Sequence, residues 1–211
     1  MSLMREGCQR RNTDRVRGVK DRGQIEWVVG PFFVLLLSIL AYTQLQLASW
    51  RSTAAYLEDA LAASNLAAAL IDVKEYGKTN KVCIKDEEMA YDIFLDAVQD
   101  NLCLDEQWEC ANTAMISGPV EIRDFVIYNV DKKKVKAARV GANGLVKESW
   151  DGTLGQLRAP NGVLVEHTGI YSEISFPVEG FMGITVEAHK GKLVDIVSMK
   201  GDRLKNGDKK G

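Results

Sequence analysis

One stretch of sequence restricts this chain more than any other. From Trp27 to Ser49 there is no charged side chain, and Trp27 to Tyr42 is almost wholly apolar. At ~1.5 Å per helical residue the uncharged run extends about 35 Å, enough to cross the ~30 Å hydrocarbon core of a bilayer. It is longer than the apolar core of a secretory signal, and the helical pattern continues beyond it without a small-x-small exit. We therefore expect an uncleaved transmembrane helix over residues 24–48.

The charges flanking this run indicate its orientation. Residues 1–23 carry seven basic and three acidic side chains, whereas the rest of the chain carries 20 basic and 26 acidic ones. Basic residues beside a membrane helix mark its cytoplasmic side. We expect a basic cytoplasmic segment over residues 1–23 and an extracellular carboxyl-terminal part in the cell membrane, with lipid as a partner. The acidic remainder argues against nucleic acid as a partner.

Beyond the membrane, small and apolar residues recur with helical spacing. The steps alternate between four and three residues, which places these side chains on one helix face. The first stripe is Trp50, Ala54, Leu57, Leu61, Ser64, Ala68 and Ile71, and a neighbouring one is Ala63, Leu66, Leu70 and Val73. Glu58, Asp59, Asn65 and Asp72 fall largely outside both stripes. Residues 49–77 therefore predict an amphipathic continuation of the same helix, ending near Tyr76 before Gly77.

Residues 78–200 have the pattern of a second, short helix followed by strands. Asp86 is a suitable N-cap for a helix that ends near Asn101 and has an apolar face; the face comprises Tyr91, Phe94, Leu95, Val98 and Leu102. From Gly118 short alternating runs separated by turn residues indicate an antiparallel sheet. The expected strands lie within 119–130, 134–140, 145–150, 163–168, 170–180 and 183–198. The fold class is thus α+β, with one apolar sheet face against the long helix, and residues 201–211 are expected to be disordered.

The sequence carries no pattern that predicts catalysis. His167 and His189 lie on expected strands without companions at metal-ligand spacing. There is no GxSxG nucleophile elbow and no GxxxxGK[ST] phosphate loop. We therefore expect no catalytic, cofactor-binding or metal-binding residues, and a protein that is not an enzyme.

Three cysteines follow the membrane run. Cys83, Cys103 and Cys110 lie on the expected extracellular side, where disulfides form, whereas Cys8 lies on the reducing side. An odd number permits one intrachain bridge and leaves one thiol over. We expect the bridge to join Cys83 to either Cys103 or Cys110.

The amino-terminal block has a more specific pattern. Basic residues are followed by Gly23, a short spacer, Glu26, an aromatic residue and an apolar run that contains Pro31. This pattern resembles the amino terminus of type IV pilin-like proteins, in the form found in the TadE-like pseudopilins of tight-adherence pili. The resemblance covers residues 18–45, and the layout of a long helix on an antiparallel sheet is similar to that of pilins.

The resemblance implies a function and a set of residues. A prepilin peptidase would cut after Gly23 and leave Gln24 as the new terminus, whereas Glu26 and Pro31 would act in subunit assembly. Glu26 would be the third residue of the mature chain, and the family has its acid fifth. The implied function is a minor pilin or pseudopilin that assembles into or initiates a pilus, with other pilin subunits and the assembly machinery as partners. The alternative is a membrane-tethered extracellular binding or sensor domain whose helix is a simple anchor.

Overall fold

The computed structural model describes residues 6–110, 116–180 and 183–196, with the backbone alone for residues 6–26 and Val28. The expected disordered tail, 201–211, lies outside these residues. The chain divides into two compact units, Met1–Arg51 and Ser52–Gly211. Helix α1, Glu6–Ala68, runs without interruption through Pro31 and contributes to both units.

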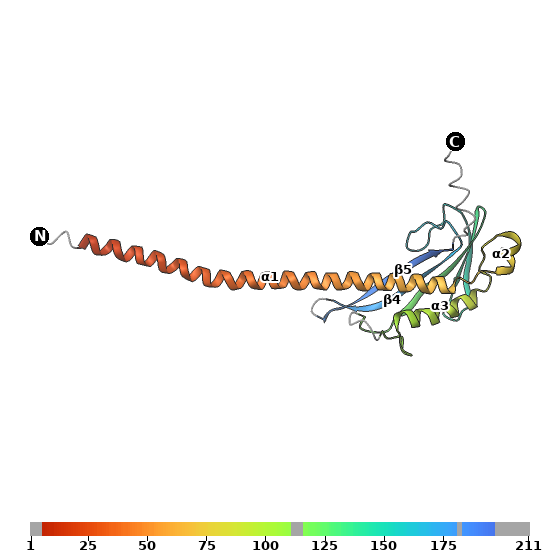
Figure 1. Ribbon diagram of the computed structural model, residues 1–211, viewed down its shortest axis with the longest axis horizontal. Coiled ribbons are helices and arrows are strands. Elements are labelled where there is room, and N and C mark those ends of the chain that lie inside the picture. The colour runs from red at the N-terminus through yellow and green to blue at the C-terminus, as the bar shows by residue number, and fades with distance from the viewer. Residues whose placement is uncertain (1–5, 111–115, 181–182, 197–211) are drawn as a thin grey trace, which may run out of the picture. The chain divides into compact units, whose positions relative to one another are not determined.

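The second unit is built around one five-stranded antiparallel sheet (Figure 1). Its strands are β1 Glu121–Asp131, β2 Lys134–Val140, β3 Val146–Thr153, β4 Gly169–Glu179 and β5 Thr185–Asp195. Their order across the sheet is β3-β2-β1-β4-β5, and each neighbouring pair is antiparallel. The predicted α+β class is confirmed, and five of the six expected strands are present in the described residues.

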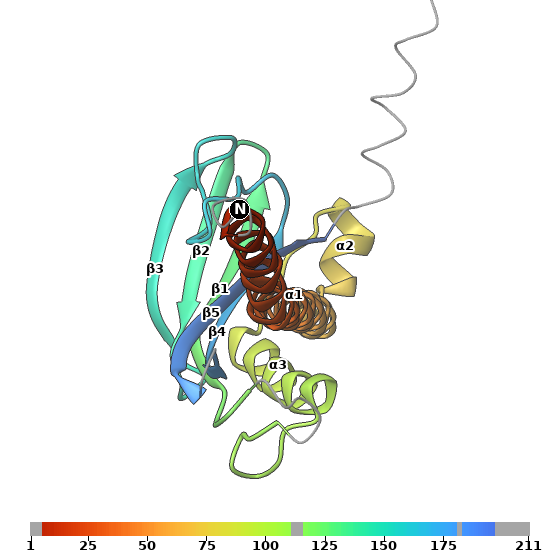
Figure 2. The same ribbon diagram turned by 90° about the vertical axis from the view of Figure 1, so that its left-hand side faces the viewer.

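Two helical segments cover one face of this sheet. They are the part of α1 from Ser52 to Ala68 and α3, Glu87–Leu102, which lie side by side (Figure 2). Asp86 is the N-cap of α3, since its Oδ1 accepts a hydrogen bond from the Met89 amide at 2.9 Å. The buried residues of α3 are Ala90, Tyr91, Phe94, Val98 and Leu102. The expected cap and apolar face of this helix are both confirmed.

The opposite face of the sheet has an apolar core of its own. Val126 and Tyr128 of β1, which alternate with inward-facing Phe125 and Ile127, pack there with Tyr171 of β4. The segment that follows β3 covers them with Ala159, Val165, Leu154 and Leu157. The expectation of a single buried face was therefore wrong. Residues 163–168, predicted as a strand, belong to this covering segment and make only an isolated bridge between Leu164 and Arg158.

Helix α1 also ends earlier than expected. It stops at Ala68, and a separate short helix, α2, begins at Val73 and ends at Thr79. Asp72 separates the two: its backbone amide donates to Cys83 O at 3.0 Å, and its Oδ1 caps α2 by accepting from the Glu75 amide at 2.9 Å. A long-range hydrogen bond and a cap thus replace the helical pattern expected to continue to Tyr76.

Of the two predicted stripes on α1, the first one faces the sheet. Leu57, Leu61, Ser64 and Ala68 are buried, and they are joined by Ala60 and Asn65. The second stripe is largely exposed: Leu66, Leu70 and Val73 are 61%, 44% and 73% exposed. We expected the second stripe to widen the buried face. The face is widened instead on the other side of the first stripe, by Ala60 and Asn65.

Candidate functional site

The apolar part of α1 is the clearest candidate for a functional surface. Within the described residues one helix is long and apolar enough to cross a membrane, in the stretch from Val29 to Ala68. Its most apolar window is not buried by any other part of the described chain. The large side chains there, such as Phe33 at 58% and Leu37 at 60%, are exposed. This distinguishes the stretch from the core helix of a soluble protein, which is mostly buried.

Polar side chains within this stretch bond to their own helix. Ser38 Oγ donates to Val34 O, and Thr43 Oγ1 donates to Leu40 O, each at 2.8 Å. Gln46 Nε2 donates to Tyr42 Oη at 2.9 Å. Hydrocarbon offers no hydrogen-bond partner, so polar groups in a membrane helix must be satisfied internally. The hydroxyls of Ser38 and Thr43 each donate within the helix, and Gln46 makes one of its bonds there.

The residues singled out by the pilin resemblance all lie on α1. Gly23, Gln24 and Glu26 belong to its helical backbone, but their side-chain surroundings lie outside what the structure describes. Pro31 lies inside the helix and is exposed, and as a proline it has no amide to donate to the Trp27 carbonyl. Beside it, a Cβ added to Gly30 would meet nothing within 4 Å. Packing among the side chains that the structure describes therefore gives no reason for a glycine at that position.

Polar contacts that sequence reasoning missed hold the carboxyl-terminal part of α1 against the sheet. Glu58 forms ion pairs with Lys190 at 2.8 Å and Lys192 at 2.6 Å, both on β5. Hydrogen bonds from these two lysines lower the pKa of Glu58 to about 2. Asn65 Nδ2 donates to Lys192 O at 2.9 Å and, with a longer bond of 3.4 Å, to Ile170 O. Asn65, expected outside the apolar stripes, is therefore a buried link between α1 and two strands.

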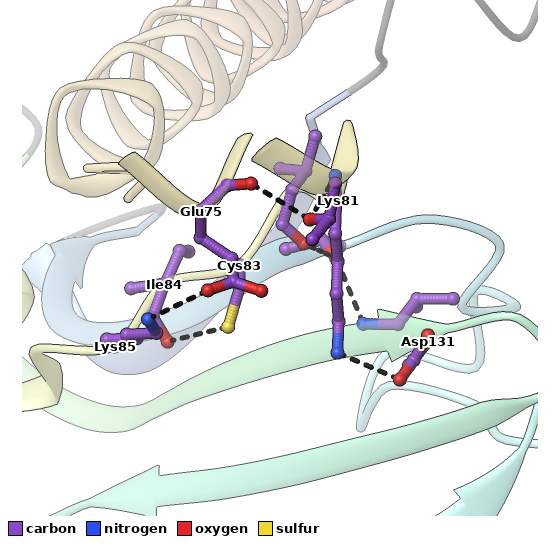
Figure 3. Close-up of polar contacts among 10 residues, drawn as sticks. Glu75, Lys81, Cys83, Ile84, Lys85 and Asp131 are labelled. Carbon is purple, nitrogen blue, oxygen red and sulfur yellow. Dashed lines mark hydrogen bonds and ion pairs between the residues drawn. The ribbon is translucent and has the colours of Figure 1, made fainter. Parts of the chain in front are cut away.

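A groove of about 410 Å³ lies on the second unit, between the segment that follows α2 and strands β1 to β3. Figure 3 shows Lys81 reaching Asp131, 2.8 Å away, across this region. Its lining residues are Lys81, Cys83, Ile84, Lys85, Glu87, Asn129, Asp131, Lys134, Lys136, Ala138 and Asp151. Four lysines and three carboxylates nearly balance, so the groove has mixed charge.

One strand residue holds the wall of this groove in place. Asn129 of β1 pairs with the Ile84 backbone, accepting from its amide and donating to its carbonyl, both at 2.8 Å. Thr168 Oγ1 likewise donates to Val82 O at 3.0 Å. A signal for Asn129 was present in the sequence, since it follows Phe125 and Ile127 on the inward-facing side of β1. A polar residue at such a position needs a partner.

The expected bridge between Cys83 and either Cys103 or Cys110 stays a prediction, and the position of α3 speaks against it. Cys83 and Cys103 are thiols in this structure. Cys83 precedes α3, and the other two follow it. A helix of 16 residues is about 24 Å long, whereas disulfides need Cα atoms within ~7 Å of each other. Burial raises the pKa of the Cys83 thiol, which makes it a weaker nucleophile than an ordinary cysteine.

No family model, curated protein or solved structure matches this chain. Among the residues that the structure describes, no group of three or more His, Cys, Asp or Glu side chains could hold a metal ion. The fold and the surfaces together define an α+β protein whose amino-terminal helix is long and apolar enough to span a membrane. Its features that point to function are this helix and the groove.

Proposed function

We propose that the chain is a minor pilin or pseudopilin, a single-pass membrane protein that assembles into or initiates a pilus of the type IV or tight-adherence kind. Its amino terminus would lie in the cytoplasm and its sheet-containing unit outside the cell. One observation carries the proposal: one continuous helix is apolar and exposed in its amino-terminal part and built into a folded unit at its carboxyl-terminal part.

Assembly would exchange one apolar environment for another. In the bilayer the side chains from Trp27 to Leu47 contact lipid, and in a fibre they contact the same region of neighbouring subunits. The apolar surface stays out of water in both states, so the exchange retains the hydrophobic stabilisation. Small residues allow helices to approach closely where there is no hydrophobic force between them. Gly30, which has open space around it, fits such an approach, and Pro31 beside it frees a carbonyl and lets the helix bend.

Glu26 would determine the stagger of the subunits. A carboxylate in a membrane helix costs ~2.5 to 3.5 kcal/mol near the bilayer centre and less near its surface. Pairing with the α-amine of a neighbouring subunit would neutralise both charges, and an incorrect stagger would leave each of them buried alone. Cleavage after Gly23 by a prepilin peptidase would create that amine on Gln24. The amino-terminal residue of the protein isolated from membranes tests this step directly.

The assembly proposal is tested by Gly30→Leu in the full chain. We expect the variant to insert into membranes at the wild-type level but to enter sheared fibres at least about tenfold less, the effect of ~1.4 kcal/mol at a helix interface. Gly77→Leu is the matched control, because Gly77 on α2 also has nothing within 4 Å of an added Cβ. Equal incorporation of both variants would count against close packing at Gly30. Glu26→Ala is expected to behave as Gly30→Leu does.

The groove favours one alternative, a membrane-tethered binding domain. A concave site of about 410 Å³ with lysines and carboxylates is large enough for a small polar ligand. On this alternative residues 1–23 stay attached and the helix serves only as an anchor. Replacing residues 27–48 by an unrelated apolar sequence separates the two functions. A tether keeps its activity after the exchange, whereas a pilin is lost from fibres.

A further inference from the structure

Two of the three extracytoplasmic cysteines meet at the end of α3. Cys103 is the C-cap of this helix and adopts a left-handed conformation, with φ 51° and ψ 48°. The chain then reverses direction, and Leu104 comes to lie opposite Cys110 in an antiparallel bridge. The Asp105 amide donates to Glu109 O at 3.1 Å inside this turn. Residues opposite each other in such a bridge have Cα atoms about 4.5 to 5.5 Å apart. Cys103 is the chain neighbour of Leu104, which lies opposite Cys110, so the two cysteines lie diagonally across the bridge.

The position of the Cys110 sulfur is further evidence that the two cysteines are close together. Cys110 Sγ lies 3.1 Å from the carbonyl oxygen of Leu102. That oxygen belongs to the peptide that joins Leu102 to Cys103, and standard geometry puts it about 3 Å from the Cys103 Cα atom. Cys110 Sγ is therefore within about 6 Å of Cys103 Cα. Cys103 is exposed, and its Sγ makes only a long contact of 3.7 Å with Asp100 O. Because this side chain is exposed, it has room to adopt another rotamer that turns its sulfur toward Cys110.

The loop between the two cysteines is held closed by its own hydrogen bonds. Asp105 Oδ1 accepts hydrogen bonds from the amides of Gln107 and Glu109, both at 2.9 Å. The Trp108 amide donates to Asp105 O at 3.0 Å, and Trp108 O accepts from the Val120 amide at 2.9 Å. These hydrogen bonds hold the turn closed and keep the two cysteines at its ends close to each other.

A side chain of α1 lies against the same place. Tyr56 Oη donates to Asn101 O at 2.6 Å, in the last turn of α3. The pKa of Tyr56 is raised, first by burial and then by the negative charge that Cys103 and Cys110 would carry as thiolates. Both sulfurs are therefore close enough to Tyr56 to interact with it. A bond between them would fasten the end of α3 beside the helix that enters the sheet-containing unit.

We propose that Cys103 and Cys110 are the disulfide pair of this protein and that Cys83 remains a thiol in the groove. Formation outside the cytoplasm rests on the proposed function, whereas the choice of partners rests on the geometry alone. The oxidant is a disulfide, either of an oxidoreductase or of a small thiol. One thiolate attacks the disulfide, forms a mixed disulfide with one of its sulfurs and releases the other as a thiol. The second thiolate then attacks the cysteine sulfur of the mixed disulfide and releases the remaining sulfur of the oxidant as a second thiol. Two protons leave the cysteines, and two electrons reduce the oxidant.

Peptide mapping of the full chain tests the pairing. Protein isolated from membranes, and the same protein reduced and then reoxidised with glutathione disulfide, is alkylated and digested with a glutamyl endopeptidase. This enzyme cuts after Glu106 and Glu109, inside the loop, so a bonded pair is recovered as two peptides that separate on reduction. We expect this linkage in the wild type and in Cys83→Ser, with Cys83 alkylated in the wild type.

The two preparations separate failure of the pairing from failure of the proposed function. A linkage that forms on reoxidation but is missing from membranes supports the pairing and counts against an extracytoplasmic location. A linkage from Cys83, or alkylation of Cys103 and Cys110 after reoxidation, overturns the pairing. Cys103→Ser is expected to leave Cys110 alkylated. The mapping of wild type and Cys83→Ser decides the matter even where Cys110→Ser fails to fold.

Discussion

Replacing Leu61 by alanine is expected to destabilise the sheet-containing unit by about 3 kcal/mol. Leu61 is 0% exposed and packs in the core between α1 and the sheet. The change removes three buried carbon atoms, and at ~0.8 kcal/mol for each the transfer of apolar surface accounts for about 2.4 kcal/mol. The cavity left behind adds to this, because the surrounding side chains relax only partly; buried Leu→Ala changes cost about 2 to 5 kcal/mol in total.

Thermal unfolding of the full chain in detergent micelles, followed by near-ultraviolet circular dichroism, measures this loss. For a protein of this size 1 kcal/mol corresponds to about 2 to 4 °C, so the midpoint should fall by about 6 to 12 °C. Leu66→Ala is the matched control, since Leu66 is on the same helix but 61% exposed. It should change stability by less than about 0.5 kcal/mol. Equal losses for both variants would refute the assignment of the buried face of α1.

Two further predictions concern buried and paired polar groups. The pKa of Glu58 is about 2 in the folded state, below its ordinary value of 4.5, so its ion pairs stabilise the fold above pH 4.5 and are lost as the pH falls towards 2. With Glu58→Gln the midpoint temperature should therefore fall less steeply between pH 5 and 2 than in the wild type. Asp59→Asn, on the exposed side of α1, should leave this pH dependence unchanged. Tyr128 Oη is buried without a partner, so Tyr128→Phe should leave stability unchanged or higher in urea unfolding. Tyr171→Phe should lower it by about 1 kcal/mol, because Tyr171 Oη donates to Glu173 at 2.6 Å.

Local signals in the sequence predicted several elements correctly. The cap, the apolar face and the length of α3 depend on residues within one segment, and these were predictable from spacing alone. The same holds for β1, β2 and β4, whose apolar runs are separated by turn residues. The apolar stretch of α1 is likewise recognisable from composition, because hydrocarbon is a uniform surrounding that demands little beyond apolar side chains.

Errors arose where distant contacts override local preference. Apolar sequence continues past Ala68, but Asp72 bonds to Cys83 and the helix ends before it. A readable signal existed, since Asp72 followed three residues later by Glu75 is typical of a helix start. The alternation of residues along β4 predicted that one face of the sheet is exposed to solvent. Tyr171 on that face is instead covered by the segment after β3, whose position no local pattern predicts.

The candidate site could be predicted only in part from the sequence, because it too depends on contacts between distant segments. Gly23, Gln24, Glu26 and Pro31 were found by resemblance, and their roles stay predictions. The groove was not foreseen, because its lining residues come from three strands and the segment before α3. The proposed cysteine pairing rests on the chain reversal after α3, which spacing along the sequence does not reveal.

The internal hydrogen bonds of Ser38, Thr43 and Gln46 have a consequence for traffic in both directions. Because each of these side chains keeps its partner whatever surrounds the helix, none of them must break a bond on leaving a bilayer or on returning to it. On the proposed function, this would suit a subunit that leaves the membrane for a fibre and returns to it.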